Sequence, residues 1–231
     1  MTQKDYESFA IKSLGGAFKN QDLLLLAFTH RSYLNEHRKS AQEHNERLEF
    51  LGDAVLELAV TEHLYHNYDE PEGILTNWRS ALVRTESLSA AAHKLGFESY
   101  LRLSRGERNG SERARQQILA NTFEAVIGAI YLDRGFKPAR DFVKEHIIST
   151  LDAILHHDLW RDPKSRLQEV AQRQDGMTPN YKVIEEEGPD HDKVFTIGVF
   201  VGDELKGQGT GPSKQAAQQS AAEQALETYE A

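Results

Sequence analysis

The sequence predicts two consecutive domains, an all-α domain followed by a small α+β domain with the order α-β-β-β-α. In residues 5–157, apolar side chains recur at three- and four-residue steps, which is the spacing of amphipathic helices. Beyond residue 163, short runs alternate polar and apolar side chains as strands do. The segment 213–229 is rich in Ala and Gln, which favour helix. We therefore expect a helical domain with a separate, smaller domain attached.

The change of pattern places the domain boundary near the segment HHDLWRDP. We assign residues 1–157 to the helical domain, 158–163 to a linker and 164–231 to the second domain. The second domain is expected to begin with a helix over 164–174. Its strands are expected over 180–187, 194–201 and 204–209, before the final helix.

Composition restricts the classes of site and partner. The chain has no cysteine, which excludes disulfides and cysteine-ligated metal sites, so any metal must be held by oxygen or imidazole. No apolar run approaches the roughly 18 to 20 residues of a membrane span, and the first residues lack the order of a secretory signal. We expect a cytoplasmic protein without a membrane partner. No glycine-rich nucleotide-binding pattern occurs, so no nucleotide cofactor is expected.

Three carboxylates share one stripe of the helix predicted around residues 44–56. At about 100° per residue, Glu46, Glu49 and Asp53 fall within roughly 60° of one another. The opposite, buried side is expected to carry Leu48, Leu51, Val55 and Leu58. Like charges at three- and four-residue spacing repel and destabilise a helix. A solvated acidic face is one interpretation, and a cation bound to the stripe is the other.

A second helix, predicted over residues 116–132, is apolar nearly all the way round and is expected to be buried. Glu124 is its only ionisable group before Tyr131. A buried carboxylate is costly unless it is paired or bound to metal. Asn121 lies one turn earlier on the same face. The alternative to a metal ligand is a polar core residue satisfied by a neighbouring helix.

Oxygen ligands of this kind are the ones that Mg²⁺ and Mn²⁺ select, and phosphate is the usual partner of these ions. Phosphodiester hydrolysis suits such a site, because the ions activate water and neutralise charge on the leaving oxygen. His63 and His66, three residues apart on a predicted helix, form a weaker candidate pair for zinc. For these two histidines we favour an ordinary surface position.

These motifs resemble those of ribonuclease III. Residues 45–56, NERLEFLGDAVL, resemble the signature of that family and its surroundings, and residues 27–33, AFTHRSY, resemble its upstream motif. The resemblance extends through residues 82–84 and 118–133, and the C-terminal part is similar to a double-stranded-RNA-binding domain. Essentially the whole chain is covered, in the two-domain architecture of the bacterial enzymes.

The resemblance implies a homodimeric endoribonuclease that cuts double-stranded RNA, with Mg²⁺ as cofactor and Mn²⁺ as a substitute. Each of the two sites would cut one strand and leave a 5′-phosphate, a 3′-hydroxyl and a two-nucleotide 3′ overhang. Precursor ribosomal RNA and structured messenger RNA are the implied substrates.

Carried over by position, the resemblance also implies roles for single residues. The implied metal ligands are Glu49, Asp53, Asn121 and Glu124. The implied catalytic acids are Asp53, Glu124, Glu46 and Glu72, and Phe50 would serve dimerisation. The family has an aspartate where this chain has Asn121, whose amide oxygen can coordinate an ion but brings no charge. We expect the remaining carboxylates to suffice for activity.

The second domain is expected to bind RNA weakly. The contacts implied by the resemblance are Ser165, Gln168, Glu169, His191, Ser213 and Lys214. The first three would reach ribose 2′-hydroxyls in a minor groove. Without the resemblance, these three residues would be read as an ordinary helix start, and the loop GPDH, which contains His191, as an ordinary turn. Lys214 opens the last helix, where backbone N–H groups favour a phosphate, but the further basic residues usual in the family are missing. Residues 161–231 hold 8 Lys and Arg against 13 Asp and Glu, in a chain of net charge −9. Affinity should therefore be modest and sensitive to salt.

Five arginines precede the second predicted helix: Arg102, Arg105, Arg108, Arg113 and Arg115. They either supply phosphate contacts or belong to a solvated loop.

Three functions are compatible with the sequence. An active nuclease is favoured by the presence of both domains, a non-cleaving RNA-binding protein is suggested by Asn121, and a helical scaffold is disfavoured by Glu124 within an apolar helix.

Overall fold

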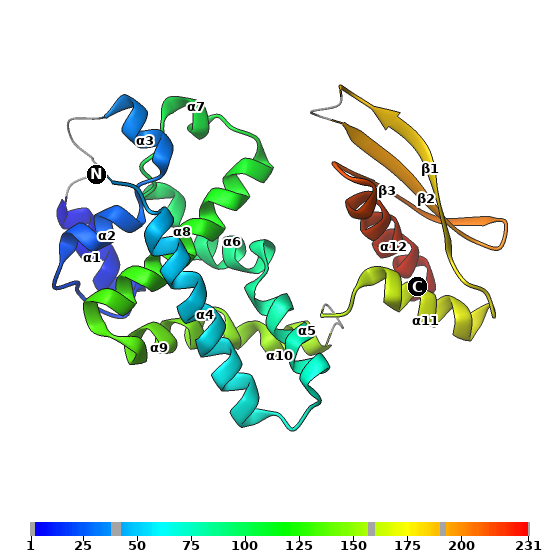
Figure 1. The fold of residues 1–231 in the computed structure, drawn as a ribbon, viewed down its shortest axis with the longest axis horizontal. Coiled ribbons are helices and arrows are strands. Elements are labelled where there is room, and N and C mark those ends of the chain that lie inside the picture. The colour runs from blue at the N-terminus through cyan, green and yellow to red at the C-terminus, as the bar shows by residue number, and fades with distance from the viewer. Residues whose placement is uncertain (1–2, 38–42, 157–159, 190–192, 231) are drawn as a thin grey trace. The chain divides into compact units, whose positions relative to one another are not determined.

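The computed structural model describes residues 3–37, 43–156, 160–189 and 193–230. The chain divides into two compact units, Met1–Trp160 and Arg161–Ala231. The first unit is helical and the second combines a three-stranded antiparallel sheet with two helices (Figure 1), so the predicted fold class is confirmed. Among the described residues, no helix has both the length and the apolar character needed to cross a membrane.

The helices of the first unit follow one another with short connections. They are α1 (Gln3–Ser13), α2 (Gln21–Ala27), α3 (Arg31–Glu36), α4 (Glu46–Asn67), α5 (Glu72–Val83), α6 (Thr85–Lys94), η1 (Phe97–Ser99), α7 (Arg105–Arg108), α8 (Glu112–Arg134), α9 (Phe136–His146), η2 (Ile148–Thr150) and α10 (Leu151–His156), of which η1 and η2 are single 3₁₀ turns.

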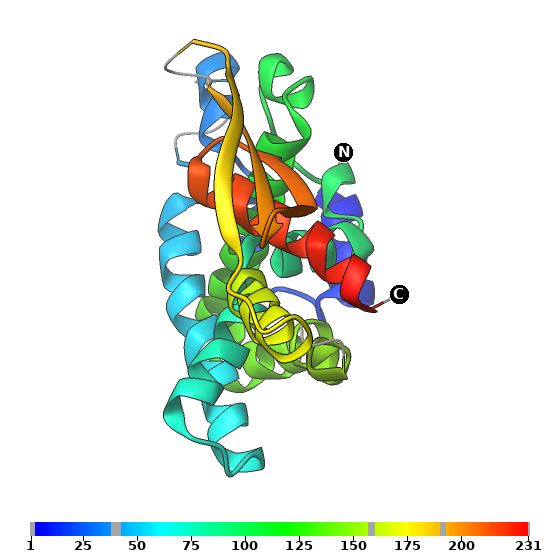
Figure 2. The same ribbon diagram turned by 90° about the vertical axis from the view of Figure 1, so that its right-hand side faces the viewer.

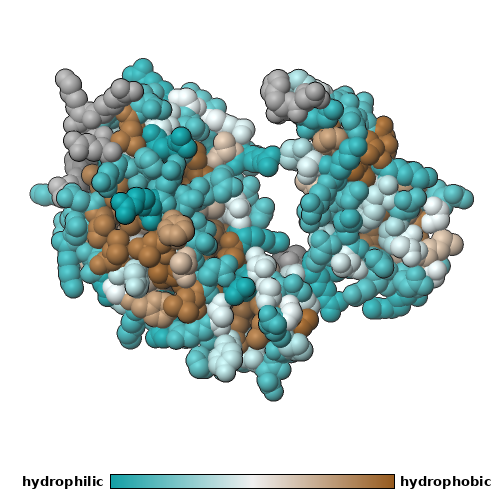
Figure 3. Space-filling view, in the orientation of Figure 1, coloured by the Kyte–Doolittle hydropathy of each residue, from teal (hydrophilic) through white to brown (hydrophobic). Residues whose placement is uncertain are grey.

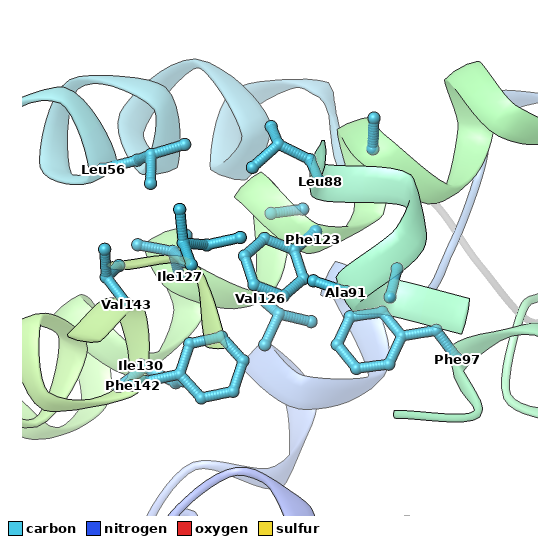
Figure 4. Packing of buried hydrophobic residues seen from close by; sticks show 14 of the residues in the cluster. Leu56, Leu88, Ala91, Phe97, Phe123, Val126, Ile127, Ile130, Phe142 and Val143 are labelled. Atoms are coloured by element: carbon cyan, nitrogen blue, oxygen red, sulfur yellow. The ribbon is translucent and has the colours of Figure 1, made fainter. Parts of the chain in front are cut away.

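Helix α8 forms the centre of this unit. It packs against α4, α6, α9 and α2, which explains why its sequence is apolar on nearly every side. Its residues Phe123, Ile127 and Ile130 are fully buried and meet side chains from the surrounding helices, as Figure 4 shows. The ring centroids of Phe123 and Phe142 lie 5.3 Å apart, within the range of favourable aromatic contacts. Such a closely packed core holds α8 in a fixed position relative to its neighbours.

The start of α4 is fixed by a buried asparagine. The side-chain amide of Asn45 donates to the carbonyl oxygen of Ala27 at 3.0 Å, and its backbone N–H donates to that of Thr29 at 2.9 Å. Asn45 is almost fully buried, so these two hydrogen bonds tie the segment after α2 firmly to the start of α4. The first turn of α4, with its carboxylates, is therefore held in place from its N-terminal end.

The second unit places two helices on one face of its sheet. The strands β1 (Asn180–Glu187), β2 (Val194–Val201) and β3 (Glu204–Gly211) pair in this order, and the helices are α11 (Pro163–Gln174) and α12 (Lys214–Glu230). Helix α12 packs against β3, β2 and α11. In Figure 2, β1 and β2 lie in front of α12. The small core contains Leu167 of α11, Val199 of β2 and the alanine-rich side of α12.

Small residues let α12 approach the sheet closely. An ideal Cβ on Gly209 would lie 2.2 Å from the backbone nitrogen of Ala221, and one on Gly207 would lie 2.5 Å from the Ala221 carbonyl oxygen. Side chains at these two strand positions would therefore push the helix away. The alternating glycines of β3 and the alanines of α12 are thus a matched pair, which explains the unusual composition of both segments.

Candidate active site

Helices α4 and α8 approach each other backbone to backbone at two glycines. An ideal Cβ on Gly52 would lie 1.8 Å from the carbonyl oxygen of Glu124, and one on Gly128 would lie 2.3 Å from the carbonyl oxygen of Leu48. Real Cβ atoms essentially never come within 3.0 Å of such atoms. No larger residue fits at either position without moving a helix. This crossing fixes the first half of α4 against the middle of α8.

Three carboxylates lie at the crossing. Glu49 and Asp53 come from α4, and Glu124 comes from α8, one turn before Gly128. Partial burial, followed by the negative charges of Asp53 and Glu49, raises the pKa of Glu124 to about 8. Burial and then the charge of Glu46 raise the pKa of Glu49 as well. Without a nearby cation, Glu124 therefore retains its proton at neutral pH.

Asn121 lies beside this cluster, and its side chain accepts a hydrogen bond from the same helix. The Nε2 group of Gln117 donates to Oδ1 of Asn121 at 2.7 Å. A hydrogen bond from the Asn121 side chain also lowers the pKa of Glu49, against the rise caused by burial. Gln117, Asn121 and Glu124 are spaced by four and three residues, so all three share the side of α8 that faces α4.

The chemistry of these donors fits a hard divalent cation. Glu49, Asp53 and Glu124 offer carboxylate oxygens, which Mg²⁺ and Mn²⁺ prefer. A cation among them would relieve the repulsion that adds to burial in raising the pKa of Glu124. Within the described ranges, however, no three His, Asp or Glu side chains are arranged as a set of metal ligands. The carboxylates would therefore have to rotate toward an ion on binding it.

The two other predicted acids have different surroundings. Glu46 lies 3.4 Å from a guanidinium nitrogen of Arg31, and its charge reaches Glu49. Glu72 begins α5, beyond the C-terminal end of α4, where it lines a cavity of about 700 Å³. At 1.5 Å per residue, the helix from Asp53 to its last residue, Asn67, is about 21 Å long. A single chain therefore does not bring Glu72 to the carboxylate cluster.

An exposed apolar stripe runs along α4 beside its acidic residues. Phe50 is 81% exposed, Leu58 56% and Tyr65 75%. Figure 3 shows hydrophobic surface gathered over the upper part of this helix. The expectation that Leu58 lies on the buried side is wrong, because the next residues, Ala59 and Val60, turn toward the core instead.

In the second unit, the predicted RNA contacts of α11 lie at its exposed start. Ser165 and Gln168 are exposed, and the backbone N–H of Ser165 donates to Oδ1 of Asp162 at 3.0 Å, which caps the helix. Glu169 is also exposed and forms an ion pair of 3.1 Å with Arg161. The hydroxyl of Ser165 and the amide of Gln168 therefore face solvent, where RNA could reach them.

Lys214, the predicted phosphate contact at the start of α12, forms an ion pair with a glutamate of the same unit. Lys214 Nζ lies 2.9 Å from Oε1 of Glu186, and Lys193 Nζ lies 3.8 Å from the other oxygen of that carboxylate. The Ser213 hydroxyl accepts the backbone N–H of the third residue after it at 3.2 Å and so caps the helix. The remaining predicted contact, His191, lies outside the described residues.

The arginine cluster divides into one structural residue and an exposed group. Arg102 stacks over the Tyr33 ring, 4.3 Å from its centroid, and donates to the Thr29 hydroxyl at 3.0 Å. These contacts give Arg102 a role in holding the motif of residues 27–33. The other members, Arg105, Arg108, Arg113 and Arg115, are exposed.

The sequence did not reveal the residues that hold the carboxylates in place without belonging to the cluster themselves. Gly52 and Gly128 set the distance between the helices, Asn45 fixes the start of α4, and Gln117 holds Asn121. A glycine in the interior of each long helix was a visible signal, because glycine is unfavourable there unless close packing requires it. No comparable signal pointed to Gln117.

The fold and the site together define a class of protein, a helical nuclease with an attached double-stranded-RNA-binding module. The family description Ribonuclease-III-like matches residues 20–151, and the description double-stranded RNA binding motif matches residues 163–229. The chain belongs to the ribonuclease III family.

Relatives and solved structures agree with this assignment. The chain is 46% identical over 217 residues to Ribonuclease 3 of Oceanobacillus iheyensis, covering 93% of this chain and 94% of that relative. It is 45% identical to Ribonuclease 3 of Enterococcus faecalis, with 93% of each covered. The nuclease domain of ribonuclease III from Campylobacter jejuni superposes with a TM-score of 0.54 at 37% identity, covering 62% of this chain and 94% of that domain.

Proposed function

We propose that this protein is a Mg²⁺-dependent endoribonuclease that hydrolyses phosphodiester bonds of double-stranded RNA, with Mn²⁺ able to replace Mg²⁺. The observation that carries the proposal is the carboxylate cluster at the crossing of α4 and α8. There partial burial, together with the nearby charges of Asp53 and Glu49, raises the pKa of Glu124 to about 8. Membership of the ribonuclease III family supports products with a 5′-phosphate, a 3′-hydroxyl and a two-nucleotide 3′ overhang.

Within this site, Glu49, Asp53 and Glu124 would hold the divalent ion. When bound, the ion supplies an activated water and neutralises negative charge on the scissile phosphate. The chain's own contribution is to keep three carboxylates at one place through the rigid contact between Gly52 and Gly128. Loss of the Glu124 proton accompanies metal binding, because a ligating carboxylate must be ionised.

We also propose a homodimer formed on the exposed stripe of α4. A contiguous apolar surface of this kind marks a protein interface more often than a solvated face. A solved structure that this chain resembles, of the nuclease domain of ribonuclease III from Campylobacter jejuni, is described as flexible in a region involved in dimer formation. A two-fold dimer on the stripe would direct Glu72 of one copy toward Glu49 of the other. This would explain how Glu72 could act at the same site as the other implied catalytic acids.

The second unit is proposed to hold duplex RNA through Ser165, Gln168, Glu169, Ser213 and Lys214. Recognition of this kind depends on helix shape and ribose 2′-hydroxyls. Its acidic charge balance supports modest affinity. The proposed setting is the cytoplasm, with precursor ribosomal RNA and structured messenger RNA as substrates.

One gel experiment tests the proposal. The purified protein is incubated with a long RNA duplex, the single strands and a DNA duplex, with Mg²⁺, with Mn²⁺ or with a chelator. The expected result is cleavage of duplex RNA alone, only with metal, and loss of cleavage in Glu124→Gln. Protection of the duplex without products in either metal would favour the second candidate, a non-cleaving RNA-binding protein, which the uncharged Asn121 suggests.

A further inference from the structure

A further cavity of the first unit lies between α4 and α9, away from the carboxylate cluster. Its volume is about 310 Å³, and the histidine pair His63 and His66 lines it. The other polar side chains on its wall are Glu62, Asn67, Arg140, Asp141 and Lys144. His63 follows Asp53 by ten residues, about 15 Å along the helix, so the cavity is separate from the proposed metal site.

The surroundings of the two histidines do not suit a zinc ion. Within the described ranges, no three His, Asp or Glu side chains form a set of metal ligands. Arg140 and Lys144 bring two positive charges to the wall. Burial, and then the charge of Lys144, lower the pKa of His63, which therefore stays neutral at neutral pH. A bound metal cation would meet the same positive charge of Lys144, whereas an anion would be attracted by it.

The neutral ring of His63 offers one defined hydrogen-bond donor. Nδ2 of Asn67 donates to the backbone carbonyl oxygen of His63 at 2.7 Å, which fixes the orientation of this amide, because a carbonyl oxygen only accepts. The same NH₂ group lies 3.3 Å from Nδ1 of His63. Nδ1 must then be the accepting nitrogen, so the ring proton is on Nε2. The group that His63 can give to a ligand is therefore Nε2–H.

The cavity wall also carries acceptors. Glu62 pairs with Arg140 at 3.2 Å, and Asp141 pairs with Lys137 at 3.0 Å, each through one carboxylate oxygen. The second oxygen of each carboxylate can still accept a hydrogen bond. Lys144 is exposed and has no ion-pair partner among the described residues. A well-matched ligand is thus an anion that accepts hydrogen bonds from the cations and His63 and also donates one to a carboxylate.

We propose that this cavity binds inorganic hydrogen phosphate, with its oxygens held by Lys144, Arg140 and His63 Nε2–H and its own hydroxyl donating to Asp141. At neutral pH, inorganic phosphate keeps at least one proton. Sulfate and the phosphodiesters of RNA have the same tetrahedral oxygens but no proton to donate, so the carboxylates of the wall select against them. The site is independent of the proposed nuclease activity.

The test is a titration of the full chain with sodium phosphate or sodium sulfate at matched ionic strength and neutral pH, without divalent metal. Long-range proton–nitrogen NMR spectra of the histidine rings report on the cavity itself. Before the titration, His63 should show the Nε2–H tautomer. Phosphate should shift its ring signals saturably, and sulfate should bind about tenfold more weakly, because one hydrogen bond to a charged group is left unmade.

Variants assign the binding to the cavity. Lys144→Gln should weaken phosphate binding about three- to tenfold, between the values typical of an exposed ion pair and of a charged hydrogen bond. Lys4→Gln is the matched control, because it removes the same charge from an exposed position of α1 outside the cavity, and it should bind like the wild type. Asp141→Asn should reduce the preference for phosphate over sulfate, because an amide can donate to sulfate.

Three outcomes would each overturn the proposal. They are the absence of a saturable shift of His63 with phosphate, equal binding of sulfate, and an equal loss of phosphate affinity in Lys144→Gln and Lys4→Gln. Both lysines are exposed, so both variants should melt at the wild-type temperature without phosphate, and a loss confined to Lys144→Gln is a loss of binding. Failure here would leave the proposed metal-dependent function untouched, because no metal or RNA enters the experiment.

Discussion

Substitution of Gly52 by alanine should separate the two helices that carry the metal-binding carboxylates. The new Cβ would lie 1.8 Å from the carbonyl oxygen of Glu124, whereas such contacts are essentially never shorter than 3.0 Å. The Cβ would clash with backbone atoms of Glu124 and Gly128, which cannot rotate away as a side chain can, so α4 must move by more than an ångström relative to α8. Overpacking of this kind costs about 3 kcal/mol, which exceeds the roughly 1 kcal/mol that alanine gains over glycine in a helix.

The stability effect can be measured by thermal unfolding of the metal-free protein. The net loss is therefore about 2 kcal/mol, which for a domain of this size corresponds to a fall in Tm of roughly 4 to 8 °C. Gly73→Ala is the matched control, because an ideal Cβ on Gly73 meets no atom within 4 Å. It should leave the Tm unchanged or slightly raised.

The same substitution should weaken Mn²⁺ binding, because Glu124 would lie farther from Glu49 and Asp53. Calorimetry at a temperature where Gly52→Ala is still folded would measure this loss. A variant with wild-type Tm and wild-type Mn²⁺ affinity would refute the reasoning that the crossing at Gly52 assembles the site.

Three further predictions concern dimerisation, the affinity for duplex RNA and the pH dependence of stability. Phe50→Asp should convert a dimer to a monomer in light scattering at micromolar concentration, because a charge would enter the apolar stripe; a persistent dimer would place the interface elsewhere. Glu186→Gln should raise affinity for duplex RNA about two- to fivefold by releasing Lys214, in keeping with the small energies of exposed ion pairs. Glu185→Gln makes the same change of charge on the adjacent strand position, so an equal gain there would exclude the ion pair as the cause. Without metal, the wild type should lose stability as pH rises from 5 to 9. The folded-state pKa of Glu124, about 8, lies above that of the unfolded chain, so the folded state binds the extra proton in this range. Calorimetric melting should show a shallower pH dependence for Glu124→Gln, and an identical slope would contradict the assignment.

Much of the fold could be predicted because local patterns agree with the tertiary structure. The apolar periodicity of α8 identified it as a buried helix, and the alternation in residues 194–201 identified the central strand β2. The acidic stripe of α4 and the lone Glu124 of α8 identified two parts of the site. These signals lie within single helices, where spacing in sequence determines which residues share a face.

What joins the two parts could not be predicted, because it depends on contacts distant in sequence. Nothing in the periodicity of α4 indicates that Gly52 touches Glu124, or that Glu72 lies at the far end of the helix. The pairing of Lys214 with Glu186 likewise depends on how α12 packs on the sheet. Leu58 illustrates the limit within one helix, since it lies at the edge of the apolar arc and its exposure depends on what packs beside it.

The central claim is that Glu49, Asp53 and Glu124 form one divalent metal site at the crossing of α4 and α8. Anomalous diffraction from crystals of the protein grown with Mn²⁺ tests it most directly. We predict a manganese peak within coordination distance of oxygens from all three carboxylates, and no such peak in crystals of Glu124→Gln. Manganese bound elsewhere, with these three side chains left unligated, would contradict the claim.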